Sequence, residues 1–154
     1  MTSAAFAASR GDYELSDDQG RLDVDAIHRF LSGAYWSAGI PRETVARALA
    51  KSLAFALDHR GATVGFARFV TDRATFAYLA DVFVLPEHRG HGLATWLVGT
   101  ALTHPDLAGL RRVMLATRDQ HALYARFGFA PLARPERFME IHDPDVYQRA
   151  TART

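Results

Sequence analysis

The spacing of apolar residues in the first half of the chain predicts a short strand, two helices and then a pair of strands. Residues 13–16 form the strand candidate. Apolar residues then recur at three- and four-residue steps, the spacing of one buried helix face, at Val24, Ile27, Phe30 and Leu31. Pro41 suits the first turn of a second helix, whose apolar stripe is Val45, Leu49 and Leu53. Two strands follow at 53–57 and 63–70, joined by a hairpin connection at 58–62.

The second half of the chain predicts strands and helices in alternation. Residues 75–85 form a longer strand that is apolar on both faces in its second half, so we place it centrally in the sheet. The helices expected after it are 93–102 and 120–127, the second ended by Gly128. The strands expected after it are 112–117, 129–132 and 138–141.

The two ends of the chain carry weak patterns. Residues 1–10 are small and apolar without a basic start, which indicates a frayed terminus and not a signal peptide. The tail after Pro144 is expected as a helical turn or loose chain. With no repeat, low-complexity segment or linker, residues 1–154 are expected to form one α/β domain with a mixed sheet.

Composition narrows the function classes. Hydrophobic residues make up 49% and charged residues 23% of the chain, which is ordinary globular usage. The net charge of +1 gives no reason to expect nucleic acid or a membrane surface as a partner. The chain has no cysteine, which excludes disulfides, thiolate metal sites and a cysteine nucleophile. The absence of cysteine fits the cytoplasmic location that we expect, and it is also compatible with export.

The strongest local signal is the junction at 78–94, where an apolar strand meets a glycine-bearing loop and a helix start. A helix start offers unpaired backbone N–H groups and a positive dipole end. Gly90 and Gly92 allow that backbone to curl around an anion, so the junction is a candidate pyrophosphate cradle, with a plain turn as the alternative. The loop lacks the lysine and Ser/Thr of a P-loop, and its spacing is not that of a dinucleotide fingerprint.

The same loop resembles the coenzyme A signature of the GNAT acetyltransferase superfamily, Gln/Arg-x-x-Gly-x-Gly/Ala. Arg89, Gly92 and Ala94 occupy its three fixed positions. The block at 123–129, Leu-Tyr-Ala-Arg-Phe-Gly-Phe, is similar to the tyrosine–glycine–phenylalanine block of the family. Many members carry an asparagine seven residues before that tyrosine, whereas this chain has Thr117, whose hydroxyl offers a shorter or replacement contact.

The resemblance implies a GNAT fold, in which a mostly antiparallel mixed sheet of six to seven strands carries helices on both faces and splays between its central strands. It also implies acetyl-CoA as the co-substrate and no metal. The residues implied for coenzyme binding are Val82, Phe83, Val84, Arg89, Gly90, His91, Gly92, Leu93, Ala94 and Thr117. For Arg89 the alternative is a plain surface charge. Tyr35 and Trp36 either wall the acceptor site or simply cover the sheet.

Transfer of an acetyl group to an amine needs a base, a donor to the carbonyl oxygen and a proton for the departing thiolate. The resemblance makes Tyr124 the candidate acid, because a phenol stays protonated at neutral pH; the alternative is a core aromatic. Asp81, a lone carboxylate in an apolar strand, is the candidate base; the alternative is an ion pair with Arg68. Asp119, Glu140 and a chain of waters are weaker candidates for the base.

The function expected from these residues is transfer of acetyl from acetyl-CoA to a small-molecule or peptide amine, by direct attack in a ternary complex. A non-catalytic acyl-CoA sensor on the same fold is the alternative, and an O- or acyl-specific transferase is a third reading. His88 and His91 lack further ligands at metal spacing, so a metal site is not expected. The two C-terminal strands could pair across a homodimer.

Overall fold

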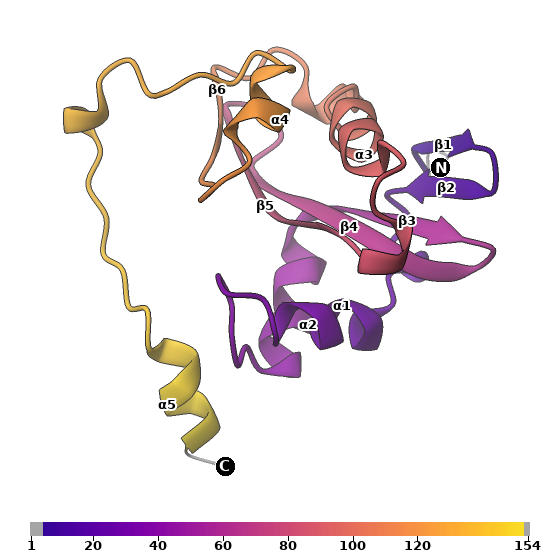
Figure 1. Cartoon of the computed structure of the whole chain (residues 1–154). Helices are drawn as coiled ribbons and strands as arrows, with labels where there is room; N and C mark the ends of the chain where they lie inside the picture. Colours follow the sequence, from indigo (N-terminus) through magenta and orange to yellow (C-terminus); the bar gives the residue numbers. More distant parts are fainter. Residues whose placement is uncertain (1–4, 153–154) are drawn as a thin grey trace.

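The computed structural model describes residues 5–152 and places six strands and five α-helices there (Figure 1). The strands are β1 (Ala7–Arg10), β2 (Tyr13–Ser16), β3 (Leu53–His59), β4 (Ala62–Thr71), β5 (Phe76–Val84) and β6 (Arg112–Leu115). The helices are α1 (Val24–Leu31), α2 (Arg42–Lys51), α3 (Leu93–Ala101), α4 (His121–Ala125) and α5 (Val146–Ala152). The elements expected between residues 13 and 127 are therefore present, with ends that differ by a few residues.

All six strands form one sheet in chain order, β1-β2-β3-β4-β5-β6. The first four pairings are antiparallel and the last, β5 with β6, is parallel. This confirms the mixed, mostly antiparallel sheet. The parallel pairing runs only from Phe76 opposite Arg112 to Leu79 opposite Leu115. Beyond this point β5 continues without β6 beside it, so the sheet opens between its last two strands.

Helices cover both faces of the sheet, as expected (Figure 1). On one face α1 and α2 pack Ile27, Leu31, Val45 and Leu49 against the sheet residues Ala54, Phe66 and Phe83. On the other face α3 packs Leu97 and Val98 against Phe55, Phe69 and Leu79. Each core follows from the sequence pattern, since residues one step apart along a strand point to opposite faces.

The long strand β5 contains a bulge at Asp81. In the pairing with β4, Phe66 lies opposite Phe83 but Arg68 lies opposite Ala80, so β5 has one extra residue in this stretch. Asp81 is the bulged residue. Its φ is 58°, a left-handed conformation that aspartate tolerates better than most side chains. The bulge bends β5 at the level where β6 ends.

The N-terminal region corrects one expectation. Residues 7–10 form β1, an edge strand paired with β2, where a frayed terminus was expected; residues 1–4 lie outside the described part. A two-residue turn that includes Gly11, with a φ of 58°, joins the two strands. The side chains of β1 are mostly exposed, so no buried face was present for a hydrophobic pattern to reveal.

The prediction of two final strands is wrong. Residues 129–132 and 138–141 have no strand partner and belong to an extended segment that leads from α4 to α5 (Figure 1). Met139 is 97% exposed and Ile141 is completely exposed. Alternation of apolar and polar residues marks a strand only where a neighbouring edge is available to pair with it. The C-terminal strands through which a dimer was expected to pair are therefore not formed.

Candidate active site

A cleft of about 930 Å³ opens where β5 and β6 separate. One wall is the bulged half of β5, and the opposite wall is the chain that continues from β6 into α4. The segment between α1 and α2 closes one end with Tyr35 and Trp36. Cavities of this volume are typical of small-molecule sites.

The structure brings most of the residues expected for the site into this cleft. Those that line it are Tyr35, Trp36, Asp81, Val82, Phe83, Val84, Arg89, Ala94, Thr117 and Tyr124. His91 and Leu93 line a separate, smaller cavity on the other side of the loop. Gly90 and Gly92 line neither of the two cavities and lie in the loop between them.

Tyr124 lies on α4 with its side chain in the wall of the cleft. The residue is only 8% exposed, and this burial raises the pKa of its phenol above the usual value, with Tyr35 acting in the same direction. Among the described residues the hydroxyl has no hydrogen-bond partner, although no buried side-chain polar atom is left unsatisfied. The hydroxyl group is therefore protonated at neutral pH and open to the space of the cleft.

Asp81 forms an ion pair with Arg68, which was one of its two expected environments. Nε of Arg68 donates to Oδ2 of Asp81 at 2.6 Å, and the side chains are 19% and 10% exposed. Nε1 of Trp36 donates to Oδ1 of the same carboxylate at 2.8 Å. Arg68 is held in turn by Ser52, whose Oγ accepts from Nη1 at 3.2 Å. The bulge thus directs the Asp81 side chain toward the guanidinium of Arg68 and the indole of Trp36.

The end of the cleft beside the segment between α1 and α2 has an aromatic wall. The Tyr35 ring lies under the Arg118 guanidinium at 3.9 Å, an arrangement that favours cation–π attraction. Phe30 stacks on Phe83 with ring centroids 4.0 Å apart, and Trp36 packs against Phe30. Tyr35 and Trp36 thus both line the cleft, where Tyr35 contacts Arg118 and Trp36 contacts Asp81.

The glycine loop has the geometry that its sequence predicts. Gly90 and Gly92 have φ values of 83° and 71°, which favour glycine over residues with a Cβ. Gly92 is the N-cap residue of the nine-residue α3, and no side chain caps the helix start. Backbone N–H groups at this end are thus available to an anion. Nε of Arg89 donates to the carbonyl of Val84 at 2.9 Å, so this guanidinium is held against the end of β5.

Thr117 has a local structural role as well as its place in the cleft. Its Oγ1 accepts from the backbone N–H of Gln120 at 3.0 Å and so fixes the turn that leads into α4. This hydrogen bond leaves the Thr117 hydroxyl proton available to another acceptor.

Sequence reasoning missed several residues of the cleft. Phe30, Tyr78 and Leu123 belong to patterned helices and strands and carry no sign that they also face a cavity. Tyr147 comes from α5, whose sequence predicted only a turn or loose chain. Gln148 Nε2 donates to the carbonyl of Ala38 at 3.1 Å, which fixes α5 beside the segment between α1 and α2. No local pattern signals such a distant contact.

Two further expectations concern metals and membranes. Within residues 5–152, no three His, Cys, Asp or Glu side chains gather as they would around a metal ion. No helix in this part of the chain has the length and apolar character needed to cross a bilayer.

Comparison with known proteins identifies the family. The sequence profile described as "Acetyltransferase (GNAT) family" matches residues 23–129. Protein FG08082 of Gibberella zeae, an acetyltransferase by name, is 35% identical over 141 residues, which is 77% of this chain and 78% of that protein.

Solved structures agree with this family. A GNAT-family protein of Xanthomonas campestris pv. campestris has 49% identity and a TM-score of 0.86, covering 88% of this chain and 96% of that one. An acetyltransferase by name from Clostridium acetobutylicum, solved with acetyl-CoA, shares the fold at 14% identity and a TM-score of 0.60, covering 84% of this chain and 94% of that one. Profile, relative and fold point the same way, and the chain belongs to the acetyltransferase (GNAT) family.

Proposed function

We propose that this protein transfers an acetyl group from acetyl-CoA to an amine by direct attack within a ternary complex. The observation that carries the proposal is the position of Tyr124. Its protonated hydroxyl faces a cleft that the diverging strands β5 and β6 open, and the glycine loop borders the same cleft through Arg89 and Ala94.

The residues present fit a coenzyme A molecule. The backbone N–H groups of Gly90, Gly92 and the first turn of α3 would hold the pyrophosphate. Both glycines have left-handed φ values and no Cβ that would block the approach of a phosphate. The half of β5 without a β6 neighbour, Val82 to Val84, would offer backbone groups to the pantetheine arm, with Thr117 on the facing wall. The thioester would then lie near Tyr124.

In the reaction the amine nitrogen forms a bond to the thioester carbonyl carbon, and the carbon–sulfur bond breaks. Tyr124 would give its phenolic proton to the departing sulfur and regain one from solvent. A phenol has a higher pKa than an ordinary thiol, so Tyr124 stays protonated at neutral pH until the thiolate forms beside it. The transfer is uphill by roughly 1.5 pKa units for ordinary groups, and uptake of a proton from solvent restores the phenol. The products are an acetamide and the free thiol of coenzyme A.

The proton lost by the amine needs an acceptor, and we propose Asp81 for this role. Its two contacts with Arg68 and Trp36 use two of the roughly four acceptor positions of a carboxylate, which leaves room for an ammonium. The contact with Arg68 fixes the direction of this carboxylate. Asp119 also lines the cleft, with a side chain that is 59% exposed, and Glu140 does not line it.

The acceptor that the cleft would take is a small-molecule or peptide amine. The aromatic rings of Tyr35 and Trp36, whose planes are 86° apart, offer an apolar wall, and Asp81 beside them offers a negative charge for the ammonium form that arrives from solution. No feature of this wall selects one amine over others of similar size.

The test is turnover of acetyl-CoA against a panel of small and peptide amines, followed by release of the free thiol. Acceptor-dependent thiol release supports the proposal, and the acetamide is then identified by mass spectrometry. Tight coenzyme binding without release for any amine or alcohol would contradict it and favour the non-catalytic acyl-CoA sensor. Release with alcohols alone would assign an O-acetyltransferase.

A further inference from the structure

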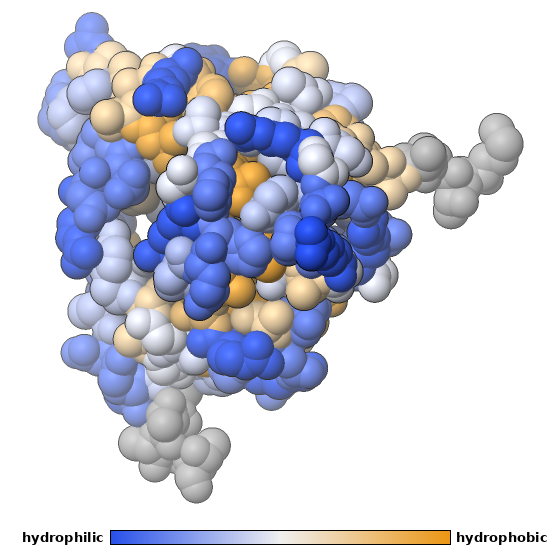
Figure 2. All heavy atoms as spheres, turned by 45° about the vertical axis from the view of Figure 1, so that its right-hand side comes forward, coloured by the Kyte–Doolittle hydropathy of each residue, from blue (hydrophilic) through white to orange (hydrophobic). Residues whose placement is uncertain are grey.

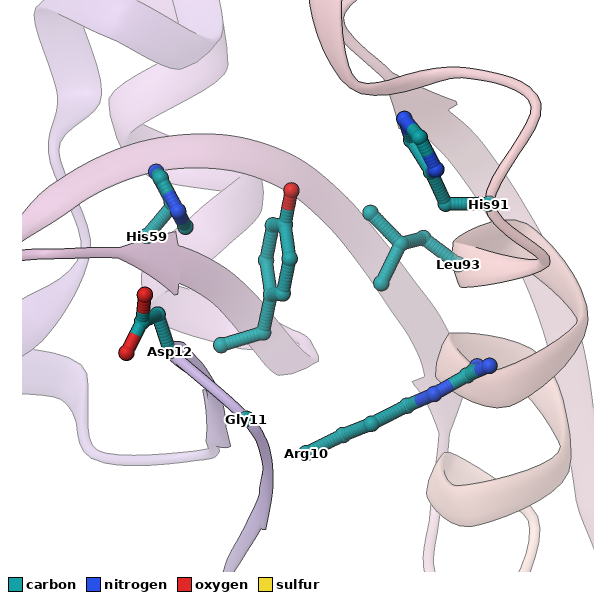
Figure 3. Close-up of a pocket in the computed structure, with 7 residues that line it drawn as sticks. Arg10, Gly11, Asp12, His59, His91 and Leu93 are labelled. Carbon is teal, nitrogen blue, oxygen red and sulfur yellow. The ribbon is translucent and has the colours of Figure 1, made fainter.

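A second cavity, of about 490 Å³, lies on the side of the glycine loop that faces away from the cleft. Its lining comes from the β1–β2 hairpin, the end of β3 and the start of α3: Arg10, Gly11, Asp12, Tyr13, His59, His91 and Leu93. Figure 3 shows His59 and His91 on opposite sides of this cavity, with the Arg10 side chain reaching toward the helix that begins at Leu93. The face on this side of the molecule carries mainly hydrophilic side chains at its centre (Figure 2).

The cavity carries a positive charge that the described residues leave uncompensated. Nη1 of Arg10 donates to the carbonyl of Gly92 at 3.4 Å, and within residues 5–152 no carboxylate lies within ion-pair distance of this guanidinium. Asp12 is the only carboxylate in the lining, and it is already paired with Arg60, whose Nη2 lies 3.0 Å from Oδ2. Arg10 therefore points its free donors into a cavity without a negative group to receive them.

Histidine and tyrosine side chains hold the hairpin firmly against the loop. The Tyr13 hydroxyl and Nδ1 of His88 form a hydrogen bond of 2.8 Å between residues 75 positions apart. The His59 ring packs against both partners, with centroids 4.5 Å from Tyr13 and 4.9 Å from His88. The hairpin is thus part of the same rigid unit as the coenzyme loop, so its arginine has a fixed place beside Gly92.

A ligand for this cavity must be anionic and must lie within a few ångströms of the pyrophosphate cradle. Coenzyme A carries three phosphate groups: two form the pyrophosphate, and the third is a monoester on the 3′ oxygen of its ribose. A phosphate monoester has nearly two negative charges at neutral pH and accepts charge-assisted hydrogen bonds from arginine and histidine. The cavity volume exceeds that of a phosphate and leaves room for part of the attached nucleoside.

We propose that Arg10, with His59 and His91, binds the 3′-phosphate of coenzyme A in the cavity between the β1–β2 hairpin and the glycine loop. This rests on the proposed function, in which the loop holds the pyrophosphate. The hairpin would then be the part of the coenzyme site that binds the third phosphate. It would make the protein selective for coenzyme A over acyl carriers that lack a 3′-phosphate.

The test compares coenzyme A with 3′-dephospho-coenzyme A by titration calorimetry. We expect the wild-type protein to bind coenzyme A at least tenfold more tightly, the scale of one or two hydrogen bonds to a charged group. Arg10→Gln removes the charge and shortens the side chain; it should weaken coenzyme A binding about tenfold and leave dephospho-coenzyme A unchanged. Arg47→Gln makes the same change of charge at an exposed residue of α2. It serves as the matched control and should alter the affinity for neither coenzyme.

Each other result has a definite meaning. Equal wild-type affinity for the two coenzymes overturns the 3′-phosphate site but leaves the proposed function standing. An equal loss for both coenzymes in Arg10→Gln also overturns it, because Arg10 would then act on the pyrophosphate or on the loop. If inorganic phosphate binds with an affinity that depends on Arg10 while the coenzyme ratio does not, the cavity is a separate anion site and the inference is wrong. Failure of the wild type to bind either coenzyme would refute the proposed function itself.

Discussion

Replacement of Tyr124 by phenylalanine is the most direct test of the proposed chemistry, because it removes one oxygen and keeps the ring. The hydroxyl has no hydrogen-bond partner among the described residues, so its loss leaves no buried polar group unpaired. The ring keeps its edge-to-face contact with Phe129, whose centroid lies 5.9 Å away. We therefore expect the free energy of unfolding to change by less than about 0.5 kcal/mol.

The effect on rate should be much larger than the effect on binding. A positioned acid contributes about 10²–10⁴-fold to turnover, and Tyr124→Phe should lose this factor in kcat. Coenzyme A affinity should change by less than about tenfold, since one neutral hydrogen bond is worth about 0.5–1.5 kcal/mol. Burial raises the pKa of Tyr124, so the hydroxyl stays protonated at alkaline pH, and the wild-type rate should not fall through loss of this proton below about pH 10.

The assay is steady-state release of free thiol from acetyl-CoA with the best amine of the panel, together with calorimetric binding of coenzyme A. Tyr78→Phe removes the same atom from another tyrosine that lines the cleft and should lower kcat by less than about tenfold. Equal losses of rate and affinity in Tyr124→Phe would show that the hydroxyl binds and does not catalyse. Unchanged rate and affinity would refute the reasoning and return Tyr124 to the role of a core aromatic.

Three more substitutions test other parts of the structure. Gly92→Val should abolish measurable coenzyme A binding by calorimetry, because a β-branched residue is strained at a φ of 71° and would deform the cradle. Asp81→Asn should lower kcat by about 10²–10⁴-fold and should also lower stability by on the order of 3 kcal/mol, since Arg68 loses its charged partner. Gly65→Ala should cost about 1–3 kcal/mol in chemical denaturation, because its new Cβ would lie 2.9 Å from Cδ2 of Leu57.

Matched controls separate these effects from general damage. Gly109→Val imposes the same left-handed strain at a φ of 76° away from the loop and should leave coenzyme binding intact. Asp119→Asn removes the other carboxylate of the cleft, and a large loss of kcat there but not in Asp81→Asn would assign the base to Asp119. Gly20→Ala places a Cβ at an ordinary 3.4 Å from its neighbour, so a loss of stability as large as that of Gly65→Ala would contradict the packing argument.

The parts of the fold that could be predicted are those that bury one face. The stripes of α1, α2 and α3 and the continuous apolar runs of β3 and β4 follow directly from the demand that apolar residues meet in a core. The exposed strand β1 has no such face, and its pairing depends on backbone hydrogen bonds that any sequence makes. Residues 138–141 show the reverse error, since a strand pattern is present without an edge to pair with.

The candidate site was predictable where its chemistry requires particular residues. The sequence shows two glycines before a helix and a tyrosine ahead of Gly-Phe, and the structure places both glycines in the left-handed region. The bulge at Asp81 is not, because Asp81 and Val82 sit in an apolar run that looks like regular strand. The hydrogen bond from Trp36 to Asp81 joins residues 45 positions apart, and such long-range pairs have no local signal.

The order of the strands in the sheet bears on how the cleft comes into being. Tight turns join β1 to β2, β3 to β4 and β4 to β5, so those pairings close loops of only a few residues and carry little entropic cost. The β5–β6 pairing closes only after a crossover that contains all of α3, and the β2–β3 pairing only after one that contains α1 and α2; each holds four residue pairs. Of these strands, β2 buries Leu15 and Ser16, whereas no residue of β6 is fully buried. We therefore expect the β6–α4 wall to exchange its amide protons ahead of β3, β4 and β5 in the native protein. A coenzyme seated in the cleft would slow that exchange by mass action alone.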